Sequence, residues 1–226
     1  MADPRALLRR VALFSRLSDE MLVGLAAHLH RRSFRRDTIV FHKDQAGDAL
    51  YVVESGRIRI FLPAEGGEEL TIDVIGPGDV FGEMALLDGQ PRSASAITLE
   101  DSTLYTLGRE EFQRQLAASP TLAGALLEYM SRRVRHVMEY TETLAFLDVY
   151  GRVARVLLDM AERYGVQENG LVINLDLTQA ELATMVGATR ERINRALAAF
   201  RSQGLIETRG KKIVLLNPKR LSERIY

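Results

Sequence analysis

Three side chains that could hold a phosphorylated sugar lie close together in the segment from Gly82 to Ala96. Glu83 offers a carboxylate, Arg92 a guanidinium and Ser93 a hydroxyl. A carboxylate accepts hydrogen bonds from sugar hydroxyls, and the planar arginine fork meets two phosphate oxygens at once. Backbone N–H groups of the turn between them can close around the same anion. The segment therefore predicts a site for a small sugar phosphate; the alternative is a structural ion pair between Glu83 and Arg92.

A second group of charged residues lies near the C-terminal end. Thr178 and Thr189 are suited to cap two short helices, and Gly187 permits a tight turn between them. A helix-turn-helix places the start of its second helix in the major groove of DNA. There, arginine can bond guanine, and a carboxylate can accept from cytosine. The candidate base contacts are Arg190, Glu191 and Arg195, and Arg192 is expected to meet phosphate. The two caps, Thr178 and Thr189, are further candidate DNA contacts.

A basic hairpin is predicted directly after this second helix. Apolar runs at 205–208 and 213–216 flank a tip that contains Lys211. Such a hairpin would form a wing over the DNA backbone. The alternative is a solvent-facing helix with mixed charges, but the order helix, turn, helix and basic hairpin favours DNA binding.

The elements that must position these groups change character along the chain. Residues 1–30 are predicted to be helical, with Ser18 capping a second helix. From about 33 to 107, short apolar runs between Gly, Asp and Pro predict an antiparallel β sandwich or barrel. Strands are expected at 38–41, 49–53, 57–61 and 70–75. Asp148 should cap a helix to about 164, and a strand is expected at 171–175.

A long helix is predicted between these parts, from about 119 to 147. Its apolar residues recur at alternating spacings of four and three, which is the heptad pattern of a helix-to-helix dimer contact. The seam consists of Ala123, Leu127, Met130, Val134, Val137, Thr141 and Leu144. The alternative is a single helix lying on its own β domain, but the narrow seam and its charged flanks favour a homodimer.

Composition excludes several classes of protein. The 226 residues include no cysteine, which removes disulfides, thiolate nucleophiles and cysteine-bound iron–sulfur clusters. No apolar run is long enough to cross a membrane, and no secretory signal is evident, so a cytoplasmic location without a membrane partner is expected. The four histidines are dispersed, so we expect no metal site. The sequence shows no arrangement of serine, histidine and an acid that would indicate a hydrolase, so we do not expect an enzyme.

The net charge of zero hides an asymmetry along the chain. Residues 190–226 carry ten Lys or Arg against three Asp or Glu, a net charge of +7, so the remaining residues carry −7. A basic end on an acidic body indicates an anionic polymer as partner. On charge alone, a solvated helix face with a basic tail explains the asymmetry equally well.

The chain resembles the Crp/Fnr family of transcription regulators over nearly its whole length. Three segments carry the resemblance: 82–94, the stretch Leu-Ala-Phe-Leu-Asp at 144–148, and Arg190-Glu191 with Arg195. It implies cyclic AMP as effector, with Glu83 on the ribose hydroxyl. Arg92 and Ser93 would hold the cyclic phosphate, while Gly82 and Ala85 add backbone contacts or room.

The resemblance also implies the partners and the fold class. Arg190, Glu191 and Arg195 would read a TGTGA-like half-site in double-stranded DNA, repeated as a palindrome, and RNA polymerase would be a protein partner. No haem or iron–sulfur cluster is expected. The fold would be α+β, with an N-terminal β-roll (a cyclic-nucleotide-binding jelly roll) at 1–118, a dimerisation helix and hinge at 119–147, and a C-terminal winged helix-turn-helix at 148–226.

The chain departs from the family where the base of the nucleotide would lie. A member of the family that responds to cyclic AMP has a threonine–serine pair late in the long helix, where this chain has Val137 and Met138. A serine of the β-roll is matched by Asp73. We therefore list Asp73, Arg133, Val137 and Met138 as further candidate ligand positions.

These departures leave other functions open. The chain could bind another nucleotide, or regulate transcription without a ligand through a vestigial pocket. A third reading is a cyclic-nucleotide regulatory subunit that acts on a partner protein, which the basic second helix argues against.

Overall fold

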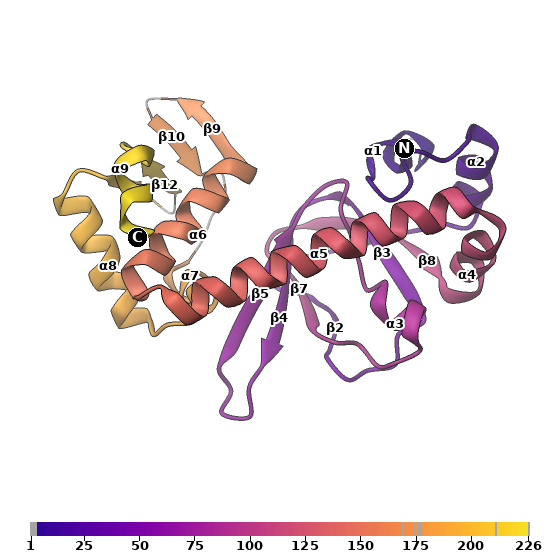
Figure 1. Cartoon of the computed structure of the whole chain (residues 1–226), viewed down its shortest axis with the longest axis horizontal. Helices are drawn as coiled ribbons and strands as arrows, with labels where there is room; N and C mark the ends of the chain where they lie inside the picture. Colours follow the sequence, from indigo (N-terminus) through magenta and orange to yellow (C-terminus); the bar gives the residue numbers. More distant parts are fainter. Residues whose placement is uncertain (1–3, 169, 174, 176–177, 211, 226) are drawn as a thin grey trace. The chain divides into compact units, whose positions relative to one another are not determined.

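The computed structural model describes residues 4–168, 170–173, 175, 178–210 and 212–225. The chain divides into two compact units, residues 1–65 with 72–137 and residues 66–71 with 138–226. We call them the N-terminal unit and the C-terminal unit. The expected α+β class, with a β-rich N-terminal part, a long helix and a C-terminal winged helix-turn-helix, is confirmed (Figure 1). The functional domains at 1–118, 119–147 and 148–226 stay a prediction.

Two antiparallel four-stranded sheets form the centre of the N-terminal unit, in the orders β1-β8-β3-β6 and β2-β7-β4-β5. Their strands are β1 (His30–Phe34), β2 (Ile39–Phe41), β3 (Ala49–Ser55), β4 (Ile58–Pro63), β5 (Glu69–Ile75), β6 (Val80–Phe81), β7 (Ser95–Thr98) and β8 (Ser102–Gly108). The strands predicted at 38–41, 49–53, 57–61 and 70–75 are confirmed as β2 to β5. The sandwich expectation is thereby confirmed.

Apolar side chains from both sheets meet in one core, which includes Val53, Ile58, Phe81 and Leu104. A second core packs four helices against β3 and β8. These helices are α1 (Pro4–Arg10), α2 (Asp19–Ala27), α4 (Arg109–Ala118) and α5 (Pro120–Phe146). Ser18 caps α2 as predicted, because its side chain accepts from the Met21 amide. The two cores hold the sheet edges that carry the candidate ligand residues.

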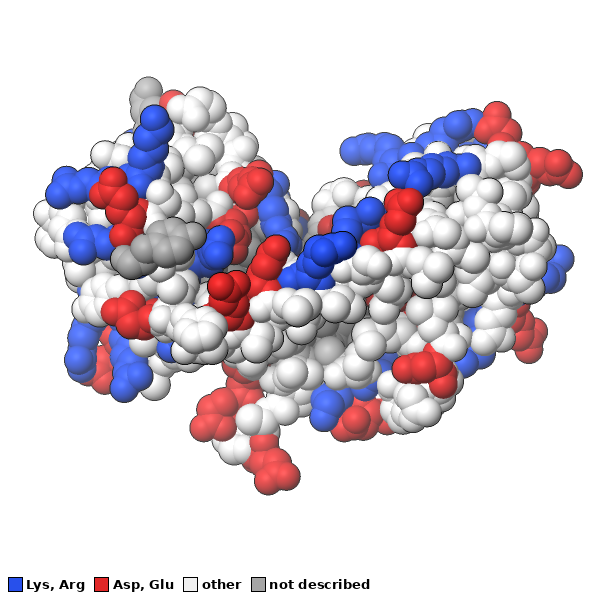
Figure 2. All heavy atoms as spheres, viewed as in Figure 1, with Lys and Arg blue, Asp and Glu red and all other residues white. Residues whose placement is uncertain are grey.

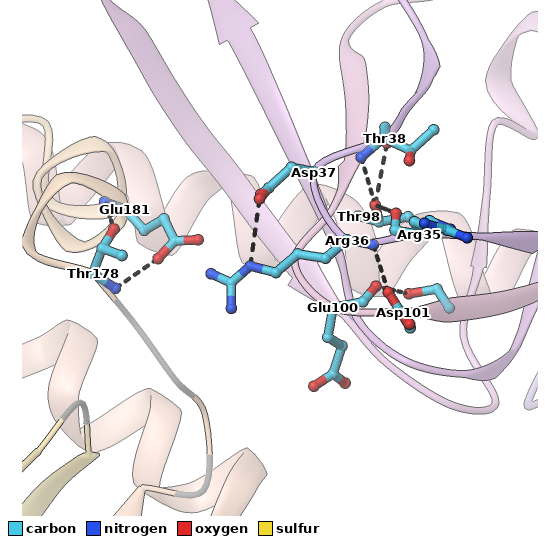
Figure 3. A network of polar contacts seen from close by, with 10 residues as sticks. Arg35, Arg36, Asp37, Thr38, Thr98, Glu100, Asp101, Thr178 and Glu181 are labelled. Carbon is cyan, nitrogen blue, oxygen red and sulfur yellow. Dashed lines mark hydrogen bonds and ion pairs between the residues drawn. The ribbon is translucent and has the colours of Figure 1, made fainter.

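A hydroxyl in β7 fixes the turn between β1 and β2 (Figure 3). The Thr98 Oγ1 donates to the carbonyl of Arg35 at 2.6 Å and accepts from the amide of Thr38 at 2.9 Å. The Asp101 carboxylate accepts from the Arg36 amide at 2.8 Å. These bonds satisfy backbone groups in a turn that brings β2 alongside β7.

The predicted long helix is confirmed as α5, and its two faces differ. Ser119 caps it, since its Oγ accepts from the amide of Leu122 at 3.1 Å. One face packs on the second core through Leu122 and Leu126. On the seam face, Leu127 is 70% exposed and Val134 56%. The helix therefore lies on its own β domain along one face and presents an apolar stripe on another.

The C-terminal unit has helices packed on a four-stranded sheet of order β11-β12-β10-β9. The helices are α6 (Val149–Tyr164), α7 (Gln179–Val186), α8 (Arg190–Ser202), α9 (Pro218–Ser222) and the 3-10 turn η1 (Glu223–Ile225). The strands are β9 (Gly165–Glu168), β10 (Gly170–Ile173), β11 (Ile206–Arg209) and β12 (Lys212–Leu215). The Asp148 Oδ1 accepts from the Gly151 amide at 2.8 Å, so the predicted cap of α6 is confirmed.

Several elements were not signalled by the sequence pattern. The β1 strand is nearly all exposed and therefore shows no apolar alternation. Helix α4 occupies residues 109–118, for which the sequence pattern predicts no element, and β9 begins at Gly165, where the pattern predicts a turn. The strand predicted at 171–175 is confirmed as β10 up to Ile173; residue 174 lies outside the described residues, and Leu175 is not in a strand.

Candidate functional site

The segment of the candidate phosphate site connects β6 to β7 through a short helix, α3 (Met84–Asp88). Gly82 precedes it at φ +78° and Gly89 ends it at φ +72°, both in the left-handed region that favours glycine. Glu83 is the residue at the start of α3. The chain therefore turns sharply on both sides of α3, which brings Glu83 and Arg92 to one pocket.

Arg92 is the centre of this pocket and is only 3% exposed. Its Nη1 donates to the carbonyl of Gly82 at 2.6 Å, and its Nη2 donates to the carbonyl of Ala49 at 2.7 Å. The guanidinium carbon lies 4.3 Å from the centre of the Phe41 ring. Burial lowers the pKa of Arg92 from its usual value, and neighbouring Tyr51, Asp48 and Glu83 partly offset that effect. The guanidinium is thus preorganised by backbone carbonyls and an aromatic face.

Two glycines leave room for this guanidinium. A Cβ at Gly82 would lie 2.6 Å from the Nη1 of Arg92, and one at Gly47 would lie 2.9 Å from its guanidinium carbon. Arg109 supports the same loops, since its Nη2 donates to the carbonyls of Gly47 at 2.6 Å and Ala85 at 2.8 Å. Sequence reasoning missed Gly47 and Arg109 as parts of this site. Only the turn signal at Gly47 could have indicated one of them.

Glu83 is 2% exposed and lies in the same pocket. Burial raises the pKa of its carboxyl, while Arg133, its own backbone amide and Arg92 pull that pKa down and only partly offset the rise. Ser93 is exposed, and its Oγ lies 3.5 Å from the sulfur of Met84. In chain order, the carboxyl of Glu83 comes before the guanidinium of Arg92 and the hydroxyl of Ser93 comes directly after it.

Arg133 brings the long helix to this pocket. Its Nη1 donates to the Asp73 Oδ2 at 3.1 Å, and the Nε2 of His136, one turn later, lies 3.7 Å from the Asp73 Oδ1. Burial alone would lower the pKa of Arg133, but the nearby charges of Tyr129, Glu83 and Asp73 raise it overall. The helix therefore contributes a cation that is shared by two carboxylates.

All five of the main predicted ligand residues line one cavity of about 40 Å³, together with Arg133. They are Gly82, Glu83, Ala85, Arg92 and Ser93. Asp73 is joined to this set through Arg133, whereas Val137 and Met138 lie on the exposed face of α5 at 46% and 66% exposure. The enclosed volume is close to that of one water molecule, so a nucleotide would have to widen it.

The helix-turn-helix lies in the C-terminal unit. Thr178 and Glu181 form a capping box at the start of α7 (Figure 3): the Thr178 amide donates to the Glu181 carboxylate at 2.6 Å, and the Glu181 amide to the Thr178 Oγ1 at 3.1 Å. Gly187 turns the chain at φ +66°. The Thr189 Oγ1 accepts from the Arg192 amide at 3.4 Å and caps α8. Each predicted cap of this motif is thereby confirmed.

The two faces of α8 separate packing from charge. Four of its apolar residues are buried, namely Ile193, Ala196, Leu197 and Phe200. The charged residues at its start, Arg190, Glu191, Arg192 and Arg195, are exposed. Arg195 forms an ion pair with Glu191 one turn earlier. The predicted base contacts are therefore brought together on one free surface, with the polar cap of Thr189 beside them.

The predicted wing is confirmed as the hairpin of β11 and β12, in which Arg209 pairs with Lys212 across the strands. The candidate contact Lys211 lies outside the described residues. On the face of the molecule that Figure 2 draws, positive and negative side chains are interspersed.

Two further features of the described residues concern the character of the helices and possible metal ligands. No helix in the described ranges combines the length and the apolar character needed to cross a membrane. Within the same residues, no three His, Cys, Asp or Glu side chains gather as metal ligands would.

Comparison with known proteins matches both parts of the chain. Residues 31–119 match the model of the cyclic nucleotide-binding domain, and residues 151–224 match that of the Crp-like helix-turn-helix domain. The CRP-like cAMP-activated global transcriptional regulator of Mycobacterium tuberculosis is 36% identical over 219 residues, covering 96% of this chain and 98% of that protein. The cyclic AMP receptor protein of Thermus thermophilus is 34% identical, covering 86% and 87%.

A solved structure agrees with this assignment. CLP, the c-di-GMP responsive global regulator of Xanthomonas campestris, superposes with a TM-score of 0.77 at 29% identity, covering 88% of this chain and 99% of that one. The pocket, the capped helix-turn-helix and these matches lead to one conclusion. The chain belongs to the Crp/Fnr family and is a cyclic-nucleotide-binding, DNA-binding transcription regulator.

Proposed function

We propose that the protein is a homodimer that responds to cyclic AMP and binds a TGTGA-like palindrome. The observation that carries this proposal is the single pocket that holds Glu83, Arg92 and Ser93 together with Arg133 of α5. A ligand there would contact both the β domain and the helix whose other face is the predicted dimer seam. Its binding could therefore favour one arrangement of the dimer over another.

The chemistry of the pocket favours a ribose with an attached phosphate. Arg92 would turn part of its fork from the carbonyls of Gly82 and Ala49 to the cyclic phosphate, and Ser93 would donate to the same oxygens. Glu83 would accept from the ribose hydroxyl. The two relatives named for cyclic AMP support that effector, while the name of CLP makes c-di-GMP the competing one.

The dimer would join two copies of α5 along the seam. Leu127, Val134 and Val137 are exposed on this face at 70%, 56% and 46%. Covering such side chains removes apolar surface from water and stabilises the contact. RNA polymerase stays a predicted protein partner.

Two recognition helices in such a dimer would read two half-sites about one DNA turn apart. Arg190 and Arg195 would bond guanine and Glu191 would accept from cytosine, which their exposure at the start of α8 supports. Release of Arg195 from its ion pair with Glu191 would accompany this contact.

The test is DNA affinity measured on a TGTGA palindrome with and without cyclic AMP, in salt of fixed concentration. We expect cyclic AMP to tighten binding by about five- to 150-fold, the usual range of allosteric coupling. A scrambled duplex of the same length is the control. Equal affinity with and without the nucleotide would refute gating, and equal affinity for both duplexes would refute the half-site.

A second candidate is a regulator of this family that cyclic AMP does not gate. It is favoured by Val137 and Met138, which offer no hydrogen-bonding group to an adenine edge, and by the engagement of Arg92 with two carbonyls. Calorimetry with cyclic AMP, cyclic GMP and c-di-GMP separates the candidates. Heat of binding with cyclic AMP alone supports the first proposal, and its absence with all three supports the second.

A further inference from the structure

A cavity that shares no lining residue with the nucleotide pocket lies within the C-terminal unit. Its volume is about 560 Å³, and its walls come from the end of α5, the start of α6 and the turn η1. Sites for small molecules usually measure about 300–1,000 Å³. The pocket around Arg92 encloses about 40 Å³. The larger cavity therefore already has the size of a ligand site.

One wall carries an aromatic ring that the proposed dimer does not explain. Phe146 is 80% exposed although it follows the last turn of the seam. It lies two residues beyond Leu144, which places it on the opposite side of the helix from the seam. Glu142, one turn earlier, lies on the same side as Phe146 and also lines the cavity. The ring is therefore available to the cavity.

The cavity also contains a cation that has no partner among the described residues. Arg155 of α6 is partly buried, and within the described part of the chain it makes no hydrogen bond or ion pair. By contrast, Arg224 donates to the Gln203 Oε1 at 2.5 Å, and the Asp148 Oδ1 is used by the cap of α6. A partly desolvated guanidinium without a partner favours an anion nearby.

A glycine brings these walls together. A Cβ at Gly151 would lie only 3.1 Å from the carbonyl oxygen of Arg224. The absence of a side chain there lets the first turn of α6 approach the turn η1 closely. The cavity is thus part of the folded unit, with its ring and its cation on two different helices.

We propose that this cavity is a second ligand site, for a small organic anion with an aromatic or aliphatic body. The guanidinium of Arg155 would bind the anionic group, and the ring of Phe146 would pack on the apolar body, with Leu147 and Ile225 completing the apolar wall. Glu142 at the same wall disfavours ligands with a second negative charge. The site does not depend on the proposed nucleotide site.

The probe for the test is 8-anilinonaphthalene-1-sulfonate, which combines a sulfonate with aromatic rings and becomes fluorescent in apolar sites. It is titrated into the full chain and into three variants in the presence of saturating cyclic AMP. Arg155→Gln should weaken binding by about tenfold, the effect of losing one charged hydrogen bond. Phe146→Ala should weaken it as well, and Glu142→Gln should tighten it by about twofold.

Arg201→Gln is the matched control, because Arg201 is exposed in the last turn of α8 and should leave binding unchanged. Thermal unfolding of each variant verifies that it is folded. Equal binding by wild type, Arg155→Gln and Phe146→Ala would overturn the proposal. It would also be overturned if probe binding disappeared as the chain dimerised, because a second copy would then cover the cavity.

Discussion

Arg92 and Arg190 are both expected to bind phosphorylated partners, yet the fold treats them in opposite ways. Arg92 is 3% exposed, donates to two backbone carbonyls and lies against an aromatic ring. Arg190 is exposed at the first turn of a capped helix. Arg92 is thus part of the buried interior of its unit, whereas Arg190 lies on the exposed face of a helix whose other face is already packed.

This difference predicts how each site responds to mutation. Buried polar groups are costly to leave unpaired, so changes in the ligand pocket should alter stability and binding together. Exposed side chains contribute little to stability, so changes on α8 should alter DNA binding alone. The separation suits the proposed regulator, in which the small ligand would change the packing of the fold and α8 would contact DNA through its exposed side chains.

The largest effect is expected from Arg92→Ala. The substitution leaves the carbonyls of Gly82 and Ala49 without a donor and opens space beside Phe41. It should lower the free energy of unfolding by about 3 kcal/mol and weaken cyclic nucleotide binding about 100-fold or more. Urea unfolding and calorimetry measure the two effects.

Arg114→Ala is the control for this variant, because Arg114 is exposed on α4 and pairs with Glu111 one turn earlier. It should change the free energy of unfolding by less than about 0.5 kcal/mol. Unchanged nucleotide affinity in Arg92→Ala would show that the segment is a structural ion-pair loop and no phosphate site.

The next effect, Arg190→Ala, concerns DNA alone. It should cost about 1–3 kcal/mol of binding to the cognate palindrome and relax specificity at one base pair. The free energy of unfolding should stay within about 0.5 kcal/mol of wild type. Fluorescence anisotropy with a set of single-base variants of the duplex measures the effect. A uniform loss over all sequences would instead identify Arg190 as a phosphate contact.

The exposed DNA-binding surface and the buried ligand pocket also differ in how well the sequence predicts them. The DNA-binding surface depends on local signals: Thr178 with Glu181, the turn at Gly187 and the cap Thr189 lie within a dozen residues, and all of them are confirmed. The dimer role of the exposed face of α5 stays a prediction, although the helix itself is confirmed. Local spacing alone thus recovered the shape of the recognition surface.

The ligand pocket depends on contacts between distant parts of the chain. The bond from Arg92 to the carbonyl of Ala49 spans 43 residues, and that from Arg133 to Asp73 spans 60. Such contacts follow from strand register and from the packing of α5, which no local pattern specifies. The residue types of the site were therefore predictable, whereas the burial of Glu83 and the supporting roles of Phe41 and Gly47 were not.

A smaller effect tests whether the exposed site is fully independent of the fold. Thr178→Ala removes one half of the capping box of α7 and should lower the free energy of unfolding by about 1 kcal/mol. Thr178→Ser keeps the hydroxyl and should restore most of it. Thermal unfolding of the two variants measures this. If both variants unfold like wild type, the cap contributes nothing, and Thr178 matters only as a candidate DNA contact.

The mildest change is Glu83→Gln, which keeps the shape of the side chain and removes its titration. Because burial raises the pKa of Glu83 above its ordinary value of 4.5, the folded chain binds a proton more tightly than the unfolded chain. This contribution to stability is fully present below pH 4.5 and is lost as the pH rises through the higher folded pKa.

In nucleotide-free buffer, Glu83→Gln should therefore have a higher Tm than wild type at pH 8, and the difference should shrink as the pH approaches 4.5. The same variant should bind cyclic nucleotide more weakly, because an amide is a poorer acceptor for a ribose hydroxyl than a carboxylate. A gain in stability with a loss of binding would show that the pocket keeps a buried charge for its ligand at the expense of the fold. A Tm of Glu83→Gln below that of wild type at pH 8 would mean that ion pairing with Arg133 outweighs the cost of burying the carboxylate. The ligand pocket and the surface of α8 would then differ in exposure, and the pocket would not lower the stability of the fold.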